Sequence, residues 1–89
     1  MHRNLKHRAN PKFWQFYNRL PDDIQILADE NYQLLKKDSF YPSLHFKKVG
    51  RFWSVRVGKD YRAVAVQKDS DIVWFWIGRH DEYERLINN

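Results

Sequence analysis

The feature that most constrains the fold of this 89-residue chain is a change in the spacing of its apolar residues near Leu44. Before this point, apolar side chains recur every three or four residues, which is the spacing of one helix face. From Leu44 onwards they alternate with polar side chains, which is the spacing of a strand with one buried face. Helices followed by a run of strands indicate an α+β fold, and the length corresponds to one domain.

Two helices are predicted within residues 11–37. Asn10 is suited to cap the first helix, and Pro11 is suited to its first position. Leu20-Pro21 ends this helix, and the acidic pair after Pro21 suits the positive end of the dipole of a second helix. The two apolar stripes comprise Phe13, Trp14, Phe16, Tyr17 and Leu20, then Ile24, Leu27, Ala28, Asn31, Leu34 and Leu35. The pair is expected to form an αα-hairpin.

Four strands are predicted at about residues 44–49, 52–57, 61–67 and 72–77. The segments between them, residues 50–51, 58–60 and 68–71, have the lengths of hairpin loops. The sequence therefore predicts a four-stranded antiparallel meander on which the αα-hairpin packs. A short C-terminal helix is expected from about residue 80. Residues 1–10 form a basic segment that is either frayed or a short edge strand, and residues 11–89 form the single domain.

These loop lengths also predict which strand residues lie opposite one another. Arg56 faces Arg62 across the middle hairpin, and Ala63 faces Trp76 across the last one. The face expected beneath the helices holds Leu44, Phe46, Trp53, Val55, Val57, Tyr61, Ala63, Ala65, Trp74 and Trp76. The opposite face holds His45, Lys47, Val49, Phe52, Ser54, Arg56, Arg62, Val64, Val66, Val73, Phe75 and Ile77, and its apolar end needs a cover.

The charge of the chain favours a polyanionic partner. There are 16 Lys and Arg against 11 Asp and Glu, a net charge of +5. The chain has no cysteine, and its four histidines are scattered, so neither a disulfide nor a metal site is expected. No apolar run approaches the length of a membrane span, and the N-terminus lacks the apolar region of a secretory signal. A cytoplasmic protein without a cofactor is expected.

The opposed pair Arg56 and Arg62 is the most informative local feature. Like charges directly opposite each other in a sheet are destabilising, so a compensating group is expected. Acidic neighbours such as Asp60, Asp81 and Glu82 are one possibility. A bound phosphate is the other, because guanidinium binds phosphate with two parallel hydrogen bonds.

A second cluster of reactive side chains follows the last strand. Arg79, His80 and Tyr83 bring a guanidinium, an imidazole and a phenol to the start of the C-terminal helix. Histidine is suited to proton transfer near neutral pH. A purely structural role is the alternative, in which Tyr83 packs on the sheet and His80 lies on the surface.

In the order of its elements, this sequence resembles the RelE/ParE superfamily of bacterial toxins. The resemblance covers about residues 11–88 and depends on three stretches: Leu20-Pro21, the hairpin from Ser54 to Arg62, and Ile77 to Tyr83. It implies a toxin of a type II toxin–antitoxin pair, neutralised by an antitoxin protein. RelE-like members cut mRNA in the ribosomal A site without a metal, by attack of the RNA 2′-OH on the adjacent phosphate.

The positions that match the catalytic residues of the family imply catalytic roles for Arg56, Arg62, Arg79, His80 and Tyr83. Either Tyr83 or His80 is then the general base. Candidate RNA-binding residues are His45, Lys47, Arg51 and Phe52. Ser54 stands where RelE-like strands carry lysine. Two other functions remain open, a ParE-like toxin that poisons DNA gyrase by binding, and a non-catalytic RNA-binding or partner-binding domain.

Overall fold

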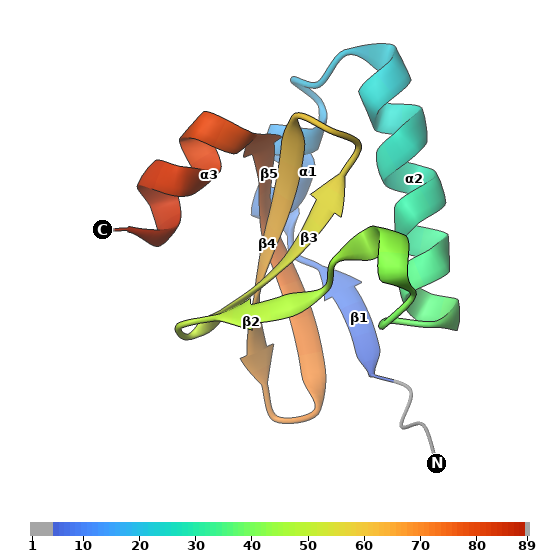
Figure 1. Cartoon of the computed structure of the whole chain (residues 1–89), viewed down its shortest axis with the longest axis vertical. Helices are drawn as coiled ribbons and strands as arrows, with labels where there is room; N and C mark the ends of the chain where they lie inside the picture. The colour runs from blue at the N-terminus through green and yellow to red at the C-terminus, as the bar shows by residue number, and fades with distance from the viewer. Residues whose placement is uncertain (1–4, 89) are drawn as a thin grey trace.

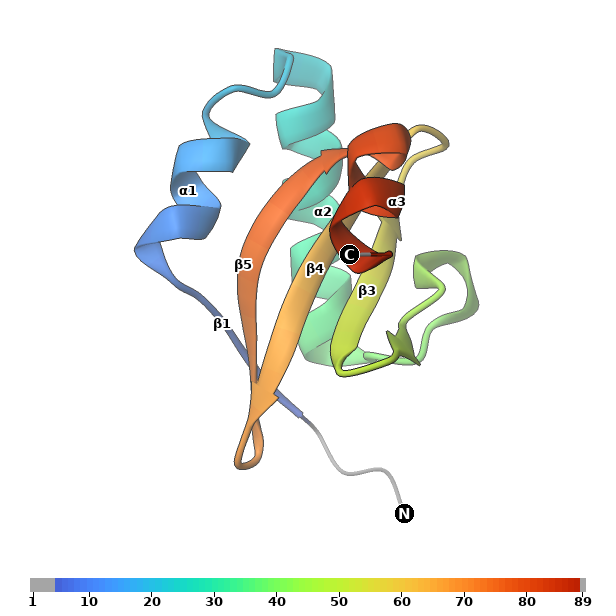
Figure 2. The ribbon, with the colours of Figure 1, turned by 90° about the vertical axis from the view of Figure 1, so that its left-hand side faces the viewer.

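The fold is a five-stranded sheet with helices on both faces (Figures 1 and 2). The computed structural model describes residues 5–88 of the chain. In chain order these form β1 (Lys6–Ala9), α1 (Pro11–Tyr17), α2 (Asp22–Lys37), a 3-10 turn (Pro42–Leu44), β2 (Lys47–Val49), β3 (Phe52–Val57), β4 (Tyr61–Lys68), β5 (Asp71–Arg79) and α3 (His80–Ile87). The α+β class, the N-terminal helix pair and the short C-terminal helix agree with the sequence.

The prediction of a four-stranded, fully antiparallel sheet is wrong. The strand order is β1-β5-β4-β3-β2, and β1 pairs with β5 in parallel. Polar side chains hold β1 in place: the Trp74 indole donates to His7 Nδ1 at 3.1 Å, and Arg8 pairs with Asp71 at 3.3 Å. A strand held in this way lacks the β-branched pattern by which strands are recognised in a sequence. Residues 1–4 of the basic segment lie outside the described residues.

The helices begin where the sequence indicates. The Asn10 side chain accepts a hydrogen bond from the Phe13 backbone N–H at 3.0 Å, and Pro11 is the first residue of α1. Asp22 and Asp23 occupy the first turn of α2, at the positive end of its dipole. Both helices lie on one face of the sheet, and α3 lies on the other (Figure 2).

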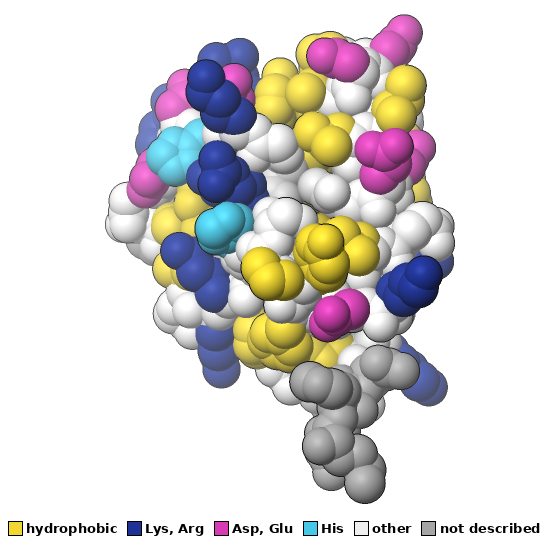
Figure 3. Space-filling view, turned by 45° about the vertical axis from the view of Figure 1, so that its right-hand side comes forward, with side chains coloured by type: hydrophobic (Ala, Val, Ile, Leu, Met, Phe, Trp, Pro, Cys, Tyr) yellow, Lys and Arg dark blue, Asp and Glu magenta, His cyan; other side chains and the backbone are white. Residues whose placement is uncertain are grey.

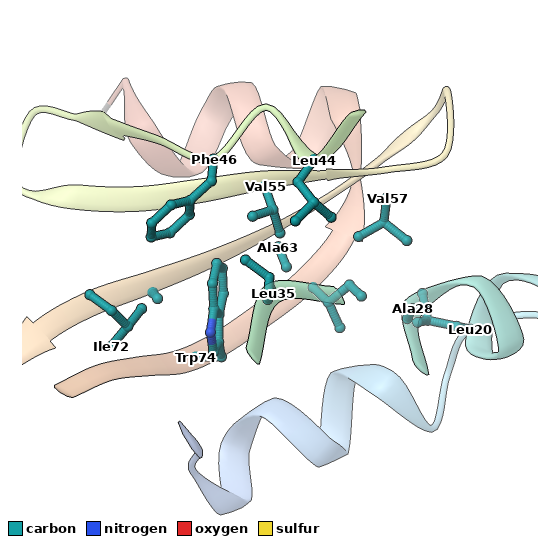
Figure 4. Packing of buried hydrophobic residues seen from close by; sticks show 12 residues of the cluster. Leu20, Ala28, Leu35, Leu44, Phe46, Val55, Val57, Ala63, Ile72 and Trp74 are labelled. Carbon is teal, nitrogen blue, oxygen red and sulfur yellow. The ribbon is translucent and has the colours of Figure 1, made fainter. Parts of the chain in front are cut away.

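The larger core lies between α1, α2 and the sheet. Trp74 is 2% exposed and lies at its centre, with Phe46, Ile72 and Leu35 around it (Figure 4). A smaller cluster joins Tyr83 of α3 to Val64 and Trp76 of the sheet. The apolar end of the second face is therefore covered by the C-terminal helix of the chain itself.

A bulge in β5 changes the predicted faces. Ala65 pairs with Trp74 as expected, but Val64 pairs with Trp76 and Ala63 with Ile77, so Phe75 is the additional residue. Trp76 consequently lies in the cluster beneath α3, whereas Ile77 lies in the core beneath α1 and α2. The prediction had these two residues on each other's face, because it assumed an uninterrupted alternation along the strand.

The first predicted strand, residues 44–49, is also shorter than expected. Pro42–Leu44 form a 3-10 turn, and His45 adopts the left-handed backbone conformation with φ of 49°. Only Lys47–Val49 pair with β3. In the described part of the chain, no helix is long and apolar enough to cross a membrane.

Candidate phosphate-binding groove

The like-charged pair predicted from the sequence is present in the sheet. Arg56 on β3 lies directly opposite Arg62 on β4, on the face that carries α3. The three-residue loop after Val57 sets this register, and it begins at Gly58, whose φ of +64° favours glycine. A loop one residue shorter would have placed the two arginines on opposite faces of the sheet.

Neither arginine is neutralised by a carboxylate within residues 5–88. Arg56 Nε donates to the Gly58 carbonyl at 3.1 Å, and an Arg62 amino group donates to the Tyr61 carbonyl at 2.8 Å. The acidic neighbours considered from the sequence do not pair with them: Asp81 pairs with Arg79, and Glu82 accepts from the Arg79 backbone N–H. The remaining guanidinium N–H groups are therefore available to an anion.

A groove of about 320 Å³ lies over this pair. It runs between α3 and the sheet and is lined by five basic side chains besides Tyr83 and Glu84. Its lining residues are His45, Lys47, Val49, Ser54, Val55, Arg56, Arg62, His80, Tyr83, Glu84 and Ile87. In the space-filling view, Lys, Arg and His side chains gather in a column down one side of the molecule (Figure 3). The positive charge of these side chains suits the phosphodiester backbone of a nucleic acid.

One turn of α3 places an imidazole and a carboxylate side by side in this groove. His80 Nε2 lies 3.3 Å from Glu84 Oε1, the spacing of residues four apart on a helix. Both side chains are about half exposed. A carboxylate that accepts from one ring nitrogen fixes the proton on that nitrogen, so the other nitrogen carries the free lone pair.

Tyr83 faces the sheet instead of solvent. It is 6% exposed, and its hydroxyl lies 3.3 Å from the Ser54 hydroxyl on β3. The interpretation that Tyr83 packs on the sheet is therefore correct for its ring. Tyr83 nevertheless is one of the residues that line the groove.

Comparisons with known proteins identify the family of this chain. Residues 22–85 match the family model of the ParE-like toxin domain. The chain belongs to this family. It is a toxin of the RelE/ParE superfamily, as the sequence predicted, and its matches to solved structures show the same fold. No curated protein matches the chain.

Three solved structures illustrate the shared fold. A RelB–RelE antitoxin–toxin complex from Methanococcus jannaschii has 15% identity and a TM-score of 0.70, covering 88% of this chain and 95% of that one. A mutant of Escherichia coli RelE in the free state has 8% identity and a TM-score of 0.65, covering 92% and 90%. The toxin–antitoxin complex RelBE2 from Mycobacterium tuberculosis has 15% identity and a TM-score of 0.64, covering 86% and 99%.

Not all the predicted site residues of the toxin share the groove. Arg56, Arg62, His80, Tyr83, His45 and Lys47 line it. Arg79 does not, because the β5 bulge reverses the alternation and turns its side chain away, where its guanidinium pairs with Asp81 at 3.7 Å. Phe52 contacts Phe75, and Arg51 lies over the Phe52 ring at 5.2 Å, both outside the lining.

Sequence reasoning missed two polar residues of the toxin's groove. Glu84 could have been found, because it lies four residues after His80 on a predicted helix. Ser54 was identified only as a departure from the family pattern, and its contact with Tyr83 depends on how α3 docks. Among residues 5–88, no group of three or more His, Asp or Glu side chains is arranged to hold a metal ion.

The two hydroxyls give a test of how the toxin's α3 is fixed. We expect Tyr83→Phe and Ser54→Ala each to lower the free energy of unfolding by about 1–2 kcal/mol, because each leaves one buried hydroxyl without its partner. The double variant should lose less than the sum, which a double-mutant cycle in urea would measure. Strictly additive losses would show that the 3.3 Å contact contributes nothing.

Proposed function

We propose that this toxin is an endoribonuclease that cleaves mRNA on the ribosome and so inhibits translation. The observation that carries the proposal is the arginine pair, which no carboxylate among residues 5–88 neutralises. The pair shares one groove with the His80 imidazole, which lies beside Glu84. A phosphorane develops negative charge on its equatorial oxygens, and fixed guanidinium groups stabilise that charge. Arg56 and Arg62 are the proposed ligands of these oxygens.

The proposed reaction is a transesterification within the RNA. His80 takes the proton of the 2′-OH, the 2′ oxygen forms a bond to phosphorus, and the bond from phosphorus to the 5′ oxygen breaks. The 5′ oxygen receives a proton, for which the Tyr83 hydroxyl is the proposed donor. The products are a 2′,3′-cyclic phosphate and a 5′-OH, with side chains supplying the acid, the base and the cations.

His80 is favoured over Tyr83 as the base by their surroundings. The imidazole is about half exposed in the groove, and its Nε2 faces Glu84. The Tyr83 hydroxyl is already a hydrogen-bond donor to Ser54, which suits the proposed role of acid better than that of base. His45 and Lys47, from the segment before β3, are proposed to bind flanking phosphates of the RNA.

The proposed protein partner is a cognate antitoxin. Two of the solved relatives are complexes of a RelE-type toxin with its RelB antitoxin, and each covers more than four fifths of this chain. The net charge of +5 favours an acidic partner. Co-expression of the toxin with the open reading frame adjacent to its gene should relieve growth arrest if that frame encodes the antitoxin.

One induction experiment tests the proposed function. The toxin is induced in cells while amino-acid incorporation, mRNA 5′ ends and plasmid supercoiling are followed together. We expect incorporation to stop and new 5′-OH ends to appear within reading frames, with supercoiling unchanged. Intact transcripts with altered supercoiling would instead favour gyrase poisoning. Intact transcripts with normal translation and supercoiling would leave only the non-catalytic binding role.

A further inference from the structure

A second groove, of about 230 Å³, lies on the other side of the first turn of α3. It is bounded by the end of β5 and by the connection between α1 and α2. The side chains that give it its chemistry are Phe16, Arg19, Tyr61, Trp76, Arg79 and Glu82.

Aromatic rings and a guanidinium form the walls of this groove. The Arg19 guanidinium lies over the Phe16 ring at 5.4 Å, and the Phe16 and Trp76 ring centroids are 6.2 Å apart. Unpaired nucleobases stack on aromatic rings and on arginine planes. The β5 bulge is what brings Trp76 to this position.

A fixed carboxylate lies beside these rings. Glu82 Oε1 accepts from the Arg79 backbone N–H at 3.2 Å, which anchors the side chain at the start of α3. The other oxygen of Glu82 and the remaining lone pairs of Oε1 are free to accept further hydrogen bonds.

Gly78 lets the Trp76 ring and the Glu82 carboxylate pack directly against the backbone at the floor of this groove. A Cβ at this position would lie 2.6 Å from Trp76 Cζ2 and 3.1 Å from Glu82 Oε1. Its backbone does not need the left-handed conformation, so the space is what requires glycine here.

We propose that the second groove binds a guanine base of the RNA next to the scissile phosphate. Guanine presents N1–H and N2–H donors to a carboxylate, and its O6 and N7 acceptors match a guanidinium. Glu82 is the proposed acceptor, Arg79 the proposed donor, and Arg19 with its aromatic neighbour the stacking surface. Adenine lacks the donor pair that a carboxylate needs, so discrimination between the purines follows.

The position of the two grooves supports one RNA strand occupying both. Arg62 lines the first groove, and its neighbour Tyr61 lines the second. In the same way, His80 lines the first groove and its neighbour Arg79 lines the second. A strand that crosses the start of α3 therefore passes from the arginine pair to Glu82. This inference rests on the proposed function, which makes RNA the ligand, and it adds that guanine is the base recognised.

Binding of mononucleotides tests the inference without any cleavage. The toxin is titrated with 5′-GMP and 5′-AMP, following tryptophan fluorescence and the NMR signals of Trp76 and Gly78. We expect GMP to bind about tenfold more tightly than AMP, the lower part of the range for a bidentate base contact. Glu82→Gln should abolish this preference while α3 stays capped, because glutamine also accepts from the backbone N–H.

The chain offers a matched control one residue away. Asp81→Asn removes the same charge from the same turn, but Asp81 does not line the groove, so the preference for GMP should remain. Arg19→Ala should weaken GMP and AMP binding equally, through loss of stacking. In cells, Glu82→Gln should still cut mRNA but at sites without enrichment of guanine.

Three results would overturn the inference. They are equal binding of GMP and AMP, retention of the preference in Glu82→Gln, and NMR shifts confined to the first groove. If no mononucleotide binds and the NMR signals of this groove shift only when the antitoxin is added, the groove is a protein contact instead. The proposed function is judged separately by transcript cleavage, so a guanine site on a toxin that leaves mRNA intact would contradict that function alone.

Discussion

Arg62→Ala is expected to slow mRNA cleavage about 100- to 1,000-fold, the usual effect of removing one group that stabilises charge in a transition state. The same change should leave the free energy of unfolding unchanged or raise it by up to about 1 kcal/mol, because it ends the repulsion with Arg56. Loss of activity together with equal or greater stability is the signature of a residue retained for binding an anion. Cleavage rates on ribosome-bound mRNA and urea unfolding would provide the two measurements.

Arg85→Ala is the matched control for this change. Arg85 lies on α3, is exposed and does not line either groove, so its loss reduces the net charge equally without touching the arginine pair. Its cleavage rate should stay within about threefold of the unmodified toxin. If both variants lose activity equally, charge steering and not a phosphate site would explain the effect. If Arg62→Ala keeps full activity, the assignment of the groove is wrong.

Local signals in the sequence were sufficient for most of the fold. Asn10 and Pro11 begin α1 through their own capping chemistry, and the hairpin lengths set the opposition of Arg56 and Arg62. These features depend on residues close together in the chain. They also brought four of the five predicted catalytic residues into one groove.

The features that were missed or left undecided depend on contacts between distant residues. The sequence left residues 1–10 as either frayed or a short edge strand, because β1 is held by Trp74, which lies 67 positions from His7 in the chain, and no alternation marks it as a strand. The bulge at Phe75 shifts the register between β4 and β5, and it moved Trp76, Ile77 and Arg79 relative to the prediction. The same bulge separates Arg79 from the first groove and places it in the second.

Replacing His7 by alanine is expected to lower the free energy of unfolding by about 2–4 kcal/mol at pH 7. The Trp74 indole donates to Nδ1, and since an indole only donates, the proton of the imidazole lies on Nε2, which donates to the Ser39 hydroxyl at 2.8 Å. Ser39 in turn donates to the Leu35 carbonyl at 2.8 Å. Alanine would leave the buried indole N–H without a partner and would remove the ring that packs against Phe46.

The same residue makes stability depend on pH in a predictable direction. Burial lowers the pKa of His7 from 6.5 to about 4, because the charged imidazole is poorly solvated there. The unfolded chain therefore binds a proton at His7 before the folded chain does, and stability from this group is lost as the pH falls from 6.5 to about 4. Since the ring is only half-buried, we expect a loss of about 1–2 kcal/mol over this range.

Urea unfolding of the toxin and of His7→Ala between pH 7 and pH 4 isolates this contribution. Carboxylates titrate in both proteins over this range, so the difference between their two curves belongs to His7. That difference should be largest at pH 7 and should narrow as the solution is acidified. A constant difference would mean that the folded protein binds a proton at His7 as readily as the unfolded chain does, and that the bond from Trp74 does not hold β1 against β5.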